Sequence, residues 1–189
     1  MIFPTQKAVS GVDMSSFPSR DELVASNRRF AEDFDASALP VEPSRRLAIV
    51  TCMDSRIDAF SVFGLADGEA HIVRNAGGVI TDDVIRSLCL SQRFLGTREI
   101  ILVHHTDCGL QKVDEGAFRA QLEAELGVKP WWSVEGFDDP YQDVRQSMQR
   151  LRMTPFVAHK EHISGFVYEV NHGLLQAVDP WESAVNVSG

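Results

Sequence analysis

The hydrophobic positions along the chain form two kinds of pattern. Continuous apolar runs with β-branched residues occur at 46–53 (RLAIVTCM) and 98–105 (REIILVHH), with a shorter run at 69–75 (EAHIVRN). Such runs are typical of strands covered on both faces of a sheet. Between them, 81–96 (TDDVIRSLCLSQRFLG) has acidic residues in its first turn and a glycine after its last, which predicts a helix. Strands that alternate with helices predict parallel pairing with right-handed crossovers.

The same reading predicts the elements on either side of this region. Helices are expected over 19–34, where Ser19 and Glu22 fit a capping box and Leu23, Phe30 and Phe34 can share a face, and also over 114–127 and 139–152. Residues 162–178 predict a strand, a tight turn at 171–173, and a second strand or extended tail.

We therefore predict an α/β fold with a mainly parallel central sheet flanked by helices. One domain is expected over 1–189, with 1–40 as an N-terminal helical arm that packs on something else and 45–178 as the core.

Charge and composition narrow the classes of partner. The formal net charge of -9 disfavours nucleic acid or an anionic membrane surface as the main partner, because phosphate binding relies on clustered Lys and Arg. The apolar runs are too short for a membrane span. The first residues do not resemble a secretory signal, so we expect a cytoplasmic location. Three cysteines form an odd count, which favours reduced thiols over a disulfide framework.

Candidate metal ligands follow two of the predicted strands. Cys52 ends the first run, and His105 and Cys108 stand three apart at the end of another. Because the carboxyl ends of parallel strands meet at one edge of a sheet, these side chains can lie together. Two thiolates and one imidazole suit zinc, and a fourth position left open is typical of catalytic sites. In the competing interpretation these thiols are small buried hydrophobes, which is the one we prefer for Cys89 inside its apolar helix.

Polar residues beside the candidate ligands add possible chemistry. Asp54 and Arg56 share a parity in an extended segment and can pair, either as an ordinary loop salt bridge or, beside a metal, as an oriented proton acceptor. Gly77 and Gly78 could line a substrate pocket with their amides, or form a plain turn after a strand.

Proton transfer has three candidates, chosen on proximity in the sequence alone: His71, His104 and Asp107. His104 precedes His105 on a strand and should point to the opposite face, so we expect it to be packed or to act through a ligand.

Three motifs together resemble the β-class carbonic anhydrases: CMDSR at 52–56, RNAGG at 74–78 and HHTDCG at 104–109. The resemblance covers about 47–110, and the compact length is similar to that of bacterial or mycobacterial-type members. It implies Cys52, His105 and Cys108 as ligands of Zn²⁺ and Asp54 with Arg56 as a catalytic dyad. It also implies a parallel four-stranded sheet with helices on both faces, and a homodimer or homotetramer in which the N-terminal arm embraces a neighbour.

The activity implied by this resemblance is reversible hydration of carbon dioxide to bicarbonate and a proton by zinc-bound hydroxide that the dyad orients. The nearest alternative is a zinc hydrolase of carbonyl sulfide or carbon disulfide, which are also linear and apolar. A different class, a non-catalytic zinc-binding or regulatory module, is favoured by loss of the dyad, which is intact here. A thiol redox protein would be expected to carry a nearby resolving cysteine, and the sequence has no C-x-x-C pair.

Overall fold

A computed structural model of the chain describes residues 20–179, and it divides into two compact units at Leu39/Pro40. In the first unit, helix α1 spans Arg20–Glu32, as the sequence predicts, while Ser19 of the expected capping box lies outside the described residues. No residue of α1 is buried, and the rings of Phe30 and Phe34 contact each other with centroids 4.9 Å apart. The apolar side chains of this helix therefore have no core of their own.

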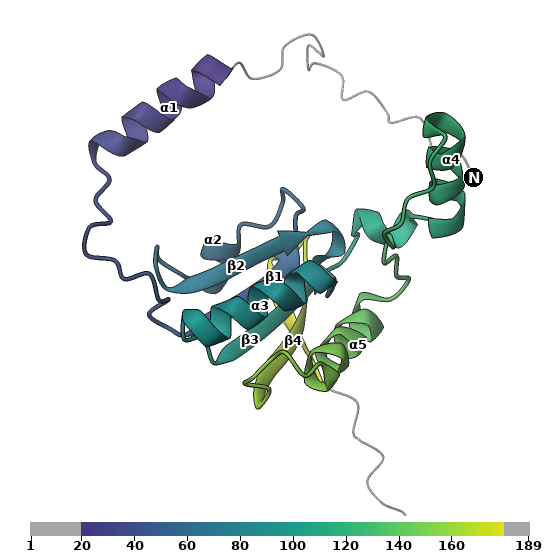
Figure 1. The fold of residues 1–189 in the computed structure, drawn as a ribbon. Helices are drawn as coiled ribbons and strands as arrows, with labels where there is room; N and C mark the ends of the chain where they lie inside the picture. Colours follow the sequence, from purple (N-terminus) through teal and green to yellow (C-terminus); the bar gives the residue numbers. More distant parts are fainter. Residues whose placement is uncertain (1–19, 180–189) are drawn as a thin grey trace, which may run out of the picture. The chain divides into compact units, whose positions relative to one another are not determined.

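The second unit is built on a five-stranded sheet in the order β2-β1-β3-β4-β5 (Figure 1). The first four strands are parallel, and β5 pairs antiparallel with β4. This confirms the prediction of a mainly parallel sheet. The family resemblance implies four parallel strands, and the structure has a fifth, antiparallel strand at the edge, which follows the turn after β4. The strands are β1 (Leu47–Cys52), β2 (Ala70–Asn75), β3 (Glu99–His105), β4 (His162–Glu169) and β5 (Leu174–Val178).

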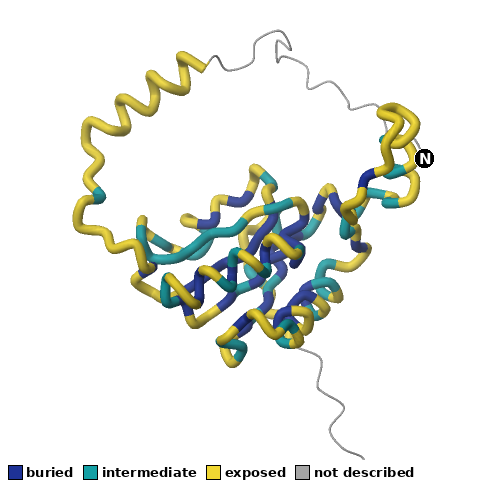
Figure 2. Tube along the Cα trace, in the orientation of Figure 1, coloured by how far each residue is buried: buried dark blue, intermediate teal, exposed yellow. Residues whose placement is uncertain are grey.

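One face of the sheet is covered by two helices, α3 (Asp82–Phe94) and α5 (Pro140–Met153). Their apolar side chains and alternate residues of β1, β3 and β4 form a continuous buried cluster, dark blue in Figure 2. Helix α5 approaches the strand closely at Gly165 of β4, where an added Cβ would lie 2.3 Å from Cγ1 of Val144. Only a glycine lets α5 pack this closely on the strand.

The opposite face carries a second cluster that includes Leu47, Ile49 and Val103. A short helix, α2 (Ala59–Phe63), packs here through Val62 and Phe63, and the sequence patterns above did not predict it. Asp58 begins α2 by accepting hydrogen bonds from the backbone N–H groups of its first turn. The segment with Asp54 and Arg56 is therefore followed directly by a capped helix, and this cap fixes the path of the chain as it leaves the edge of the sheet.

Helix α4 (Glu115–Leu126) is present where the sequence predicts it, but none of its residues is buried and it is largely yellow in Figure 2. Two short 3₁₀ helices complete the fold: η1 (Ala76–Gly78) and η2 (Gly109–Lys112). Within residues 20–179, no helix is both long and apolar enough to cross a membrane.

Candidate metal centre

The sheet register brings the sequence-predicted ligands to one edge. Cys52 is the last residue of β1, and His105 is the last residue of the neighbouring strand β3. The chain then turns, and Cys108 directly precedes η2. The three candidate ligands thus come from the carboxyl ends of adjacent parallel strands, where open α/β sheets gather their ligands.

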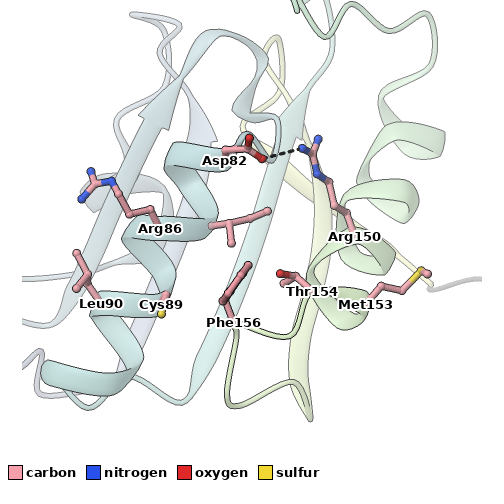
Figure 3. Close-up of a pocket in the computed structure, with 9 residues that line it drawn as sticks. Asp82, Arg86, Cys89, Leu90, Arg150, Met153, Thr154 and Phe156 are labelled. Atoms are coloured by element: carbon pink, nitrogen blue, oxygen red, sulfur yellow. Dashed lines mark hydrogen bonds and ion pairs between the residues drawn. The ribbon is translucent and has the colours of Figure 1, made fainter. Parts of the chain in front are cut away.

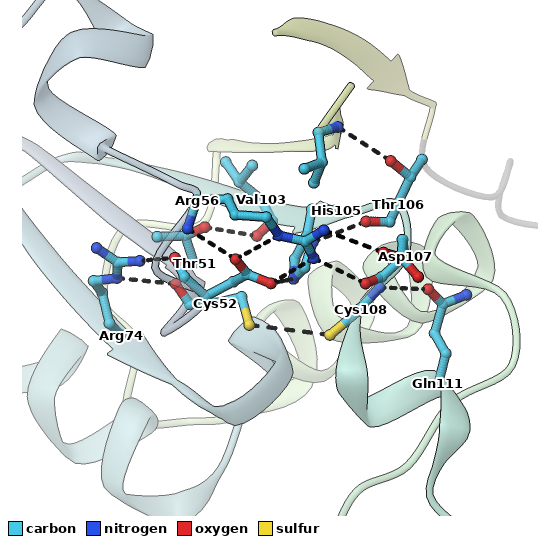
Figure 4. A network of polar contacts seen from close by, with 12 residues as sticks. Thr51, Cys52, Arg56, Arg74, Val103, His105, Thr106, Asp107, Cys108 and Gln111 are labelled. Atoms are coloured by element: carbon cyan, nitrogen blue, oxygen red, sulfur yellow. Dashed lines mark hydrogen bonds and ion pairs between the residues drawn. The ribbon is translucent and has the colours of Figure 1, made fainter. Parts of the chain in front are cut away.

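The side chains of Cys52, His105 and Cys108 converge. All three are buried, their ligand atoms lie within 4.8 Å of one another, and the two sulfurs are 4.0 Å apart (Figure 4). In the described part of the chain this is the one group of three or more Cys, His, Asp or Glu side chains close enough to hold a metal ion. The structure therefore brings together every ligand that the sequence predicted.

The imidazole of His105 is oriented for a metal. Its Nδ1 lies 3.0 Å from the carbonyl oxygen of Thr106, and because a carbonyl can only accept, Nδ1 carries the proton. Nε2 is left with its lone pair, is buried, and has no hydrogen-bond partner. A buried polar nitrogen without a partner is costly unless a further group binds it. With two sulfurs beside it, this donor set fits Zn²⁺ and leaves a fourth position open.

The two thiols influence each other strongly. Their mutual hydrogen bond lowers the pKa of Cys52 and raises the pKa of Cys108, because one sulfur takes the charge and the other keeps the proton. Backbone N–H groups of Asp54 and Gly77 also lower the pKa of Cys52. Zn²⁺ would replace the shared proton, since cysteine binds metals as thiolate.

Asp54 and Arg56 form a bidentate pair beside these donors. Nε and Nη2 of Arg56 donate to the two carboxylate oxygens of Asp54 at 2.9 and 2.7 Å. Oδ2 of Asp54 also lies 3.8 Å from Nε2 of His105, so the carboxylate lies beside the candidate ligand atoms. The Arg56 guanidinium holds the pKa of Asp54 well below its usual range. The carboxylate is thus ionised throughout the physiological range and available as a hydrogen-bond acceptor.

Arg74 supports the loop that carries these residues, a contact that the sequence analysis missed. Its guanidinium donates to the backbone carbonyls of Cys52 (2.9 Å) and Asp54 (2.7 Å) (Figure 4). Arg74 lies on β2 opposite Thr51 of β1. Arginine in the RNAGG motif was the available signal, but its partners are backbone atoms that the sequence does not reveal.

Gly77 and Gly78 have positive φ angles of 79° and 74°. An added Cβ on Gly78 would lie 2.9 Å from the backbone N of Cys52, and one on Gly77 would lie 2.4 Å from Leu110. Both glycines are therefore required where the chain after β2 presses against the metal edge. The backbone N–H of Gly77 stabilises the thiolate form of Cys52, so this turn has a direct effect on one of the candidate metal ligands.

The three proton-transfer candidates are separated by the fold. His71 pairs in register with Ala48, four residues before Cys52 on β1, and bonds to Ser91. His104 is fully buried and lies 2.6 Å from Asp143 of α5, on the helix-covered face, as its parity predicts. Asp107 alone of the three contacts the Asp54–Arg56 pair, through Arg56.

A separate cavity lies away from these residues. It has a volume of about 700 Å³ between α3 and α5, and its walls include Cys89, Leu90 and Phe156 (Figure 3). None of the candidate site residues lines it. Cys89 is half-buried there, whereas the sequence analysis expected it to be buried, and it is not part of the candidate metal centre.

The fold and the donor set are those of an α/β protein that can hold a metal ion at the carboxyl edge of its sheet. The family model described as carbonic anhydrase matches residues 47–133. Beta-carbonic anhydrase 1 of Mycobacterium tuberculosis is 48% identical over 160 residues, which are 85% of this chain and 98% of that protein. A carbon disulfide hydrolase of an Acidianus species is 33% identical over 79% of this chain and 85% of its own length.

The solved structures agree with this relationship. The crystal structure of a carbonic anhydrase from Streptococcus mutans matches with a TM-score of 0.79 and 41% identity, covering 84% of this chain and 96% of that one. The chain therefore belongs to the β-carbonic anhydrase family, whose members are metalloenzymes. This confirms the family resemblance seen in the three sequence motifs.

Proposed function

We propose that this protein catalyses the reversible hydration of carbon dioxide to bicarbonate and a proton, with Zn²⁺ held by Cys52, His105 and Cys108. The observation that carries the proposal is the geometry of the donor atoms: three buried ligand atoms lie within 4.8 Å of one another, and Nε2 of His105 has no hydrogen-bond partner. The close relationship to a mycobacterial β-carbonic anhydrase supports the same activity.

When bound at such a site, Zn²⁺ lowers the pKa of a coordinated water to about 7 and so supplies a nucleophile at neutral pH. In this proposal Oδ2 of Asp54, which lies 3.8 Å from Nε2 of His105, would accept a hydrogen bond from the nucleophile and so orient it. Arg56 keeps that carboxylate ionised and fixes its plane through two parallel hydrogen bonds. The dyad thus supplies orientation, while the two thiolates balance the charge of the ion.

Gly77 and Gly78 complete the proposed substrate pocket. Both are buried next to the end of β1, and their lack of side chains allows close approach of a small apolar molecule. Carbon dioxide has no charge to bind, so we expect its pocket to be apolar with few polar contacts.

Carbonyl sulfide or carbon disulfide is the second candidate substrate. Carbon disulfide hydrolases are among the relatives, and one from Saccharolobus solfataricus is 47% identical over 174 residues. The same donors and dyad would serve these linear molecules, so selection among them would depend on access to the site.

Parallel assays of the purified protein with the three gases test the proposal. We expect about one Zn²⁺ per chain by elemental analysis and stopped-flow hydration of carbon dioxide that exceeds sulfide release from the other two. Cys108→Ser should lose both zinc and hydration, whereas Cys89→Ser, a matched change away from the donors, should keep both. Sulfide release with negligible hydration would instead favour the second candidate.

A non-catalytic zinc-binding or regulatory module would bind the metal and turn over none of the three gases. The paired Asp54 and Arg56 weigh against that class, because a purely structural site needs no oriented carboxylate beside its ligands. Stoichiometric zinc with no turnover of any gas would establish it.

The proposal includes a homodimer or homotetramer. The exposed Leu23 and Phe30 of α1 support association, since an amphipathic helix without buried residues gains stability by packing on another surface. Sedimentation velocity gives the mass directly, and a monomer at micromolar concentration would contradict this part. A cytoplasmic location, which the free thiols favour, also belongs to the proposal.

A further inference from the structure

Asp107 occupies an unusual backbone position inside the candidate metal centre. It lies in the turn between His105 and Cys108 and has a φ of 54°, in the left-handed region that non-glycine residues rarely adopt. Aspartate tolerates this region better than most residues, but it still costs conformational energy. Its side chain is 56% exposed, so burial of apolar surface does not account for the conformation.

Both acceptor groups of Asp107 bind Arg56. The carboxylate Oδ2 accepts from Nη1 at 3.1 Å, and the backbone carbonyl accepts from Nη2 at 3.0 Å (Figure 4). Asp54 binds the same guanidinium through Nε and Nη2. All three nitrogens of Arg56 are thus engaged, and the group is held between two acidic residues 53 positions apart in the sequence.

The other carboxylate oxygen of Asp107 is bound as well. Nζ of Lys112, on η2, donates to Oδ1 at 2.7 Å. With Oδ1 bound to Lys112, Oδ2 of Asp107 is directed at the guanidinium of Arg56.

Arg56 needs such support. Its side chain is 44% exposed, and an isolated ion pair at this exposure restrains a long side chain only weakly. Rotation of the guanidinium would turn the bidentate face away from Asp54, whose carboxylate would then lose its fixed plane. The two contacts from Asp107 oppose this rotation, and they come from the turn between the candidate ligands His105 and Cys108.

We propose that Asp107 is a positioning residue that clamps the guanidinium of Arg56 and thereby fixes the carboxylate of Asp54. The inference rests on the proposed function in taking Asp54 and Arg56 as the working dyad. Asp107 then links the loop after β1 to the turn that carries His105 and Cys108, so that the carboxylate of Asp54 keeps a fixed position relative to the candidate metal ligands.

The test compares Asp107→Asn and Asp107→Gly in the zinc-loaded full chain. Both variants tolerate a positive φ, but the first loses the charge and the second loses the whole side chain. The rotation rate about the Nε–Cζ bond of Arg56 is measured by ¹⁵N NMR, with its signal assigned by its loss in Arg56→Lys. Metal content and the separate kcat and KM for carbon dioxide are measured on the same samples. Asp83→Asn, which removes an exposed aspartate paired with Arg86 on α3, is the matched control.

We expect the rotation of Arg56 to become about fivefold faster in Asp107→Gly, as loss of hydrogen bonds worth about 1 kcal/mol predicts, with Asp107→Asn in between. We expect kcat to fall about tenfold with zinc content and KM unchanged, because misplaced groups slow the reaction without weakening binding. The control should match the wild type in every measurement.

Unchanged rotation in Asp107→Gly would overturn the proposal, and so would loss of zinc without faster rotation, since Asp107 would then act on the ligand turn alone. A rise in kcat would also overturn it, because Asp107 would then compete with Asp54 for Arg56. The NMR measurement needs no turnover, so absence of hydration in the wild type would contradict the proposed function and leave the clamp tested on its own.

Discussion

His105 donates its Nδ1 proton to the backbone carbonyl of Thr106, the next residue, across 3.0 Å. This contact ties the ring to the chain as it leaves β3 and selects the tautomer whose Nε2 lone pair lies among the ligand atoms. A histidine prepared in this way needs neither a change of tautomer nor a ring flip to bind a metal.

The first prediction concerns this tautomer and the metal it prepares for. In metal-free protein, ¹⁵N NMR of His105 should show protonation at Nδ1, and zinc binding should shift Nε2 alone. His105→Ala should weaken zinc affinity by more than about 100-fold, since even outer partners of a ligand contribute 10- to 100-fold. Competition with a chelator measures the affinity, and the exposed His172→Ala is the control. Equal affinities in the two variants would remove His105 from the ligand set.

Asp54→Asn should separate metal binding from catalysis. Asparagine keeps the size of the side chain and an oxygen for Arg56 but loses the negative charge and one of the two acceptor oxygens, so kcat/KM for hydration should fall by about 100-fold or more. Zinc content should stay at the wild-type value, because Asp54 is not among the three predicted ligands. Stopped-flow hydration and elemental analysis check both, with the exposed Asp67→Asn as control. An Asp54→Asn variant of full activity would refute the role of the carboxylate.

The close packing of α5 on β4 gives a prediction about stability. Gly165→Ala places a Cβ 2.3 Å from Val144 and 3.1 Å from Met148, so the helix must move away from the strand. We expect the free energy of unfolding to fall by about 1–3 kcal/mol, as is usual for overpacked cores. Gly116→Ala is the matched control: its Cβ meets only Asp114 at 3.4 Å on exposed α4, and it should stabilise the helix by up to about 1 kcal/mol. Urea denaturation of both variants measures the difference, and a neutral Gly165→Ala would show that the interface yields at no cost.

Much of the fold could be predicted because its signals are local. The apolar runs at β1 and β3 are long enough to be recognised one at a time, and the parallel order follows from the helices between strands. Helix α2 escaped prediction because five residues are too few to show a period, although Asp58 before an apolar stretch is a capping signal. The exposure of α4 could not be inferred from its spacing, because Leu126 can share a face with other apolar residues and still remain exposed.

The candidate site divides in the same way. Side chains that follow strands, such as Cys52 and Cys108, are placed by strand order alone. Contacts between loops are not placed by strand order. Asp107 contacts Arg56 from a turn in which Asp107 itself adopts a left-handed conformation. Arg74 binds backbone carbonyl oxygens, which every residue of any sequence carries. These supporting contacts depend on the backbone path and become visible only in the structure.

Arg74 provides the test of such backbone support. Its two hydrogen bonds hold the backbone carbonyls of Cys52 and Asp54, so Arg74→Met should loosen the loop that positions these two side chains. We expect zinc affinity to fall by about 10- to 100-fold, the range for residues that orient a ligand without binding the metal. Hydration measured at saturating zinc should also fall, because the carboxylate of Asp54 loses its fixed position. The matched control is Arg86→Met, which removes an arginine whose partner is Asp83 on the same exposed helix surface. If both variants keep the zinc affinity of the wild type, the β1 strand and the Asp58 cap are sufficient to hold the loop without Arg74.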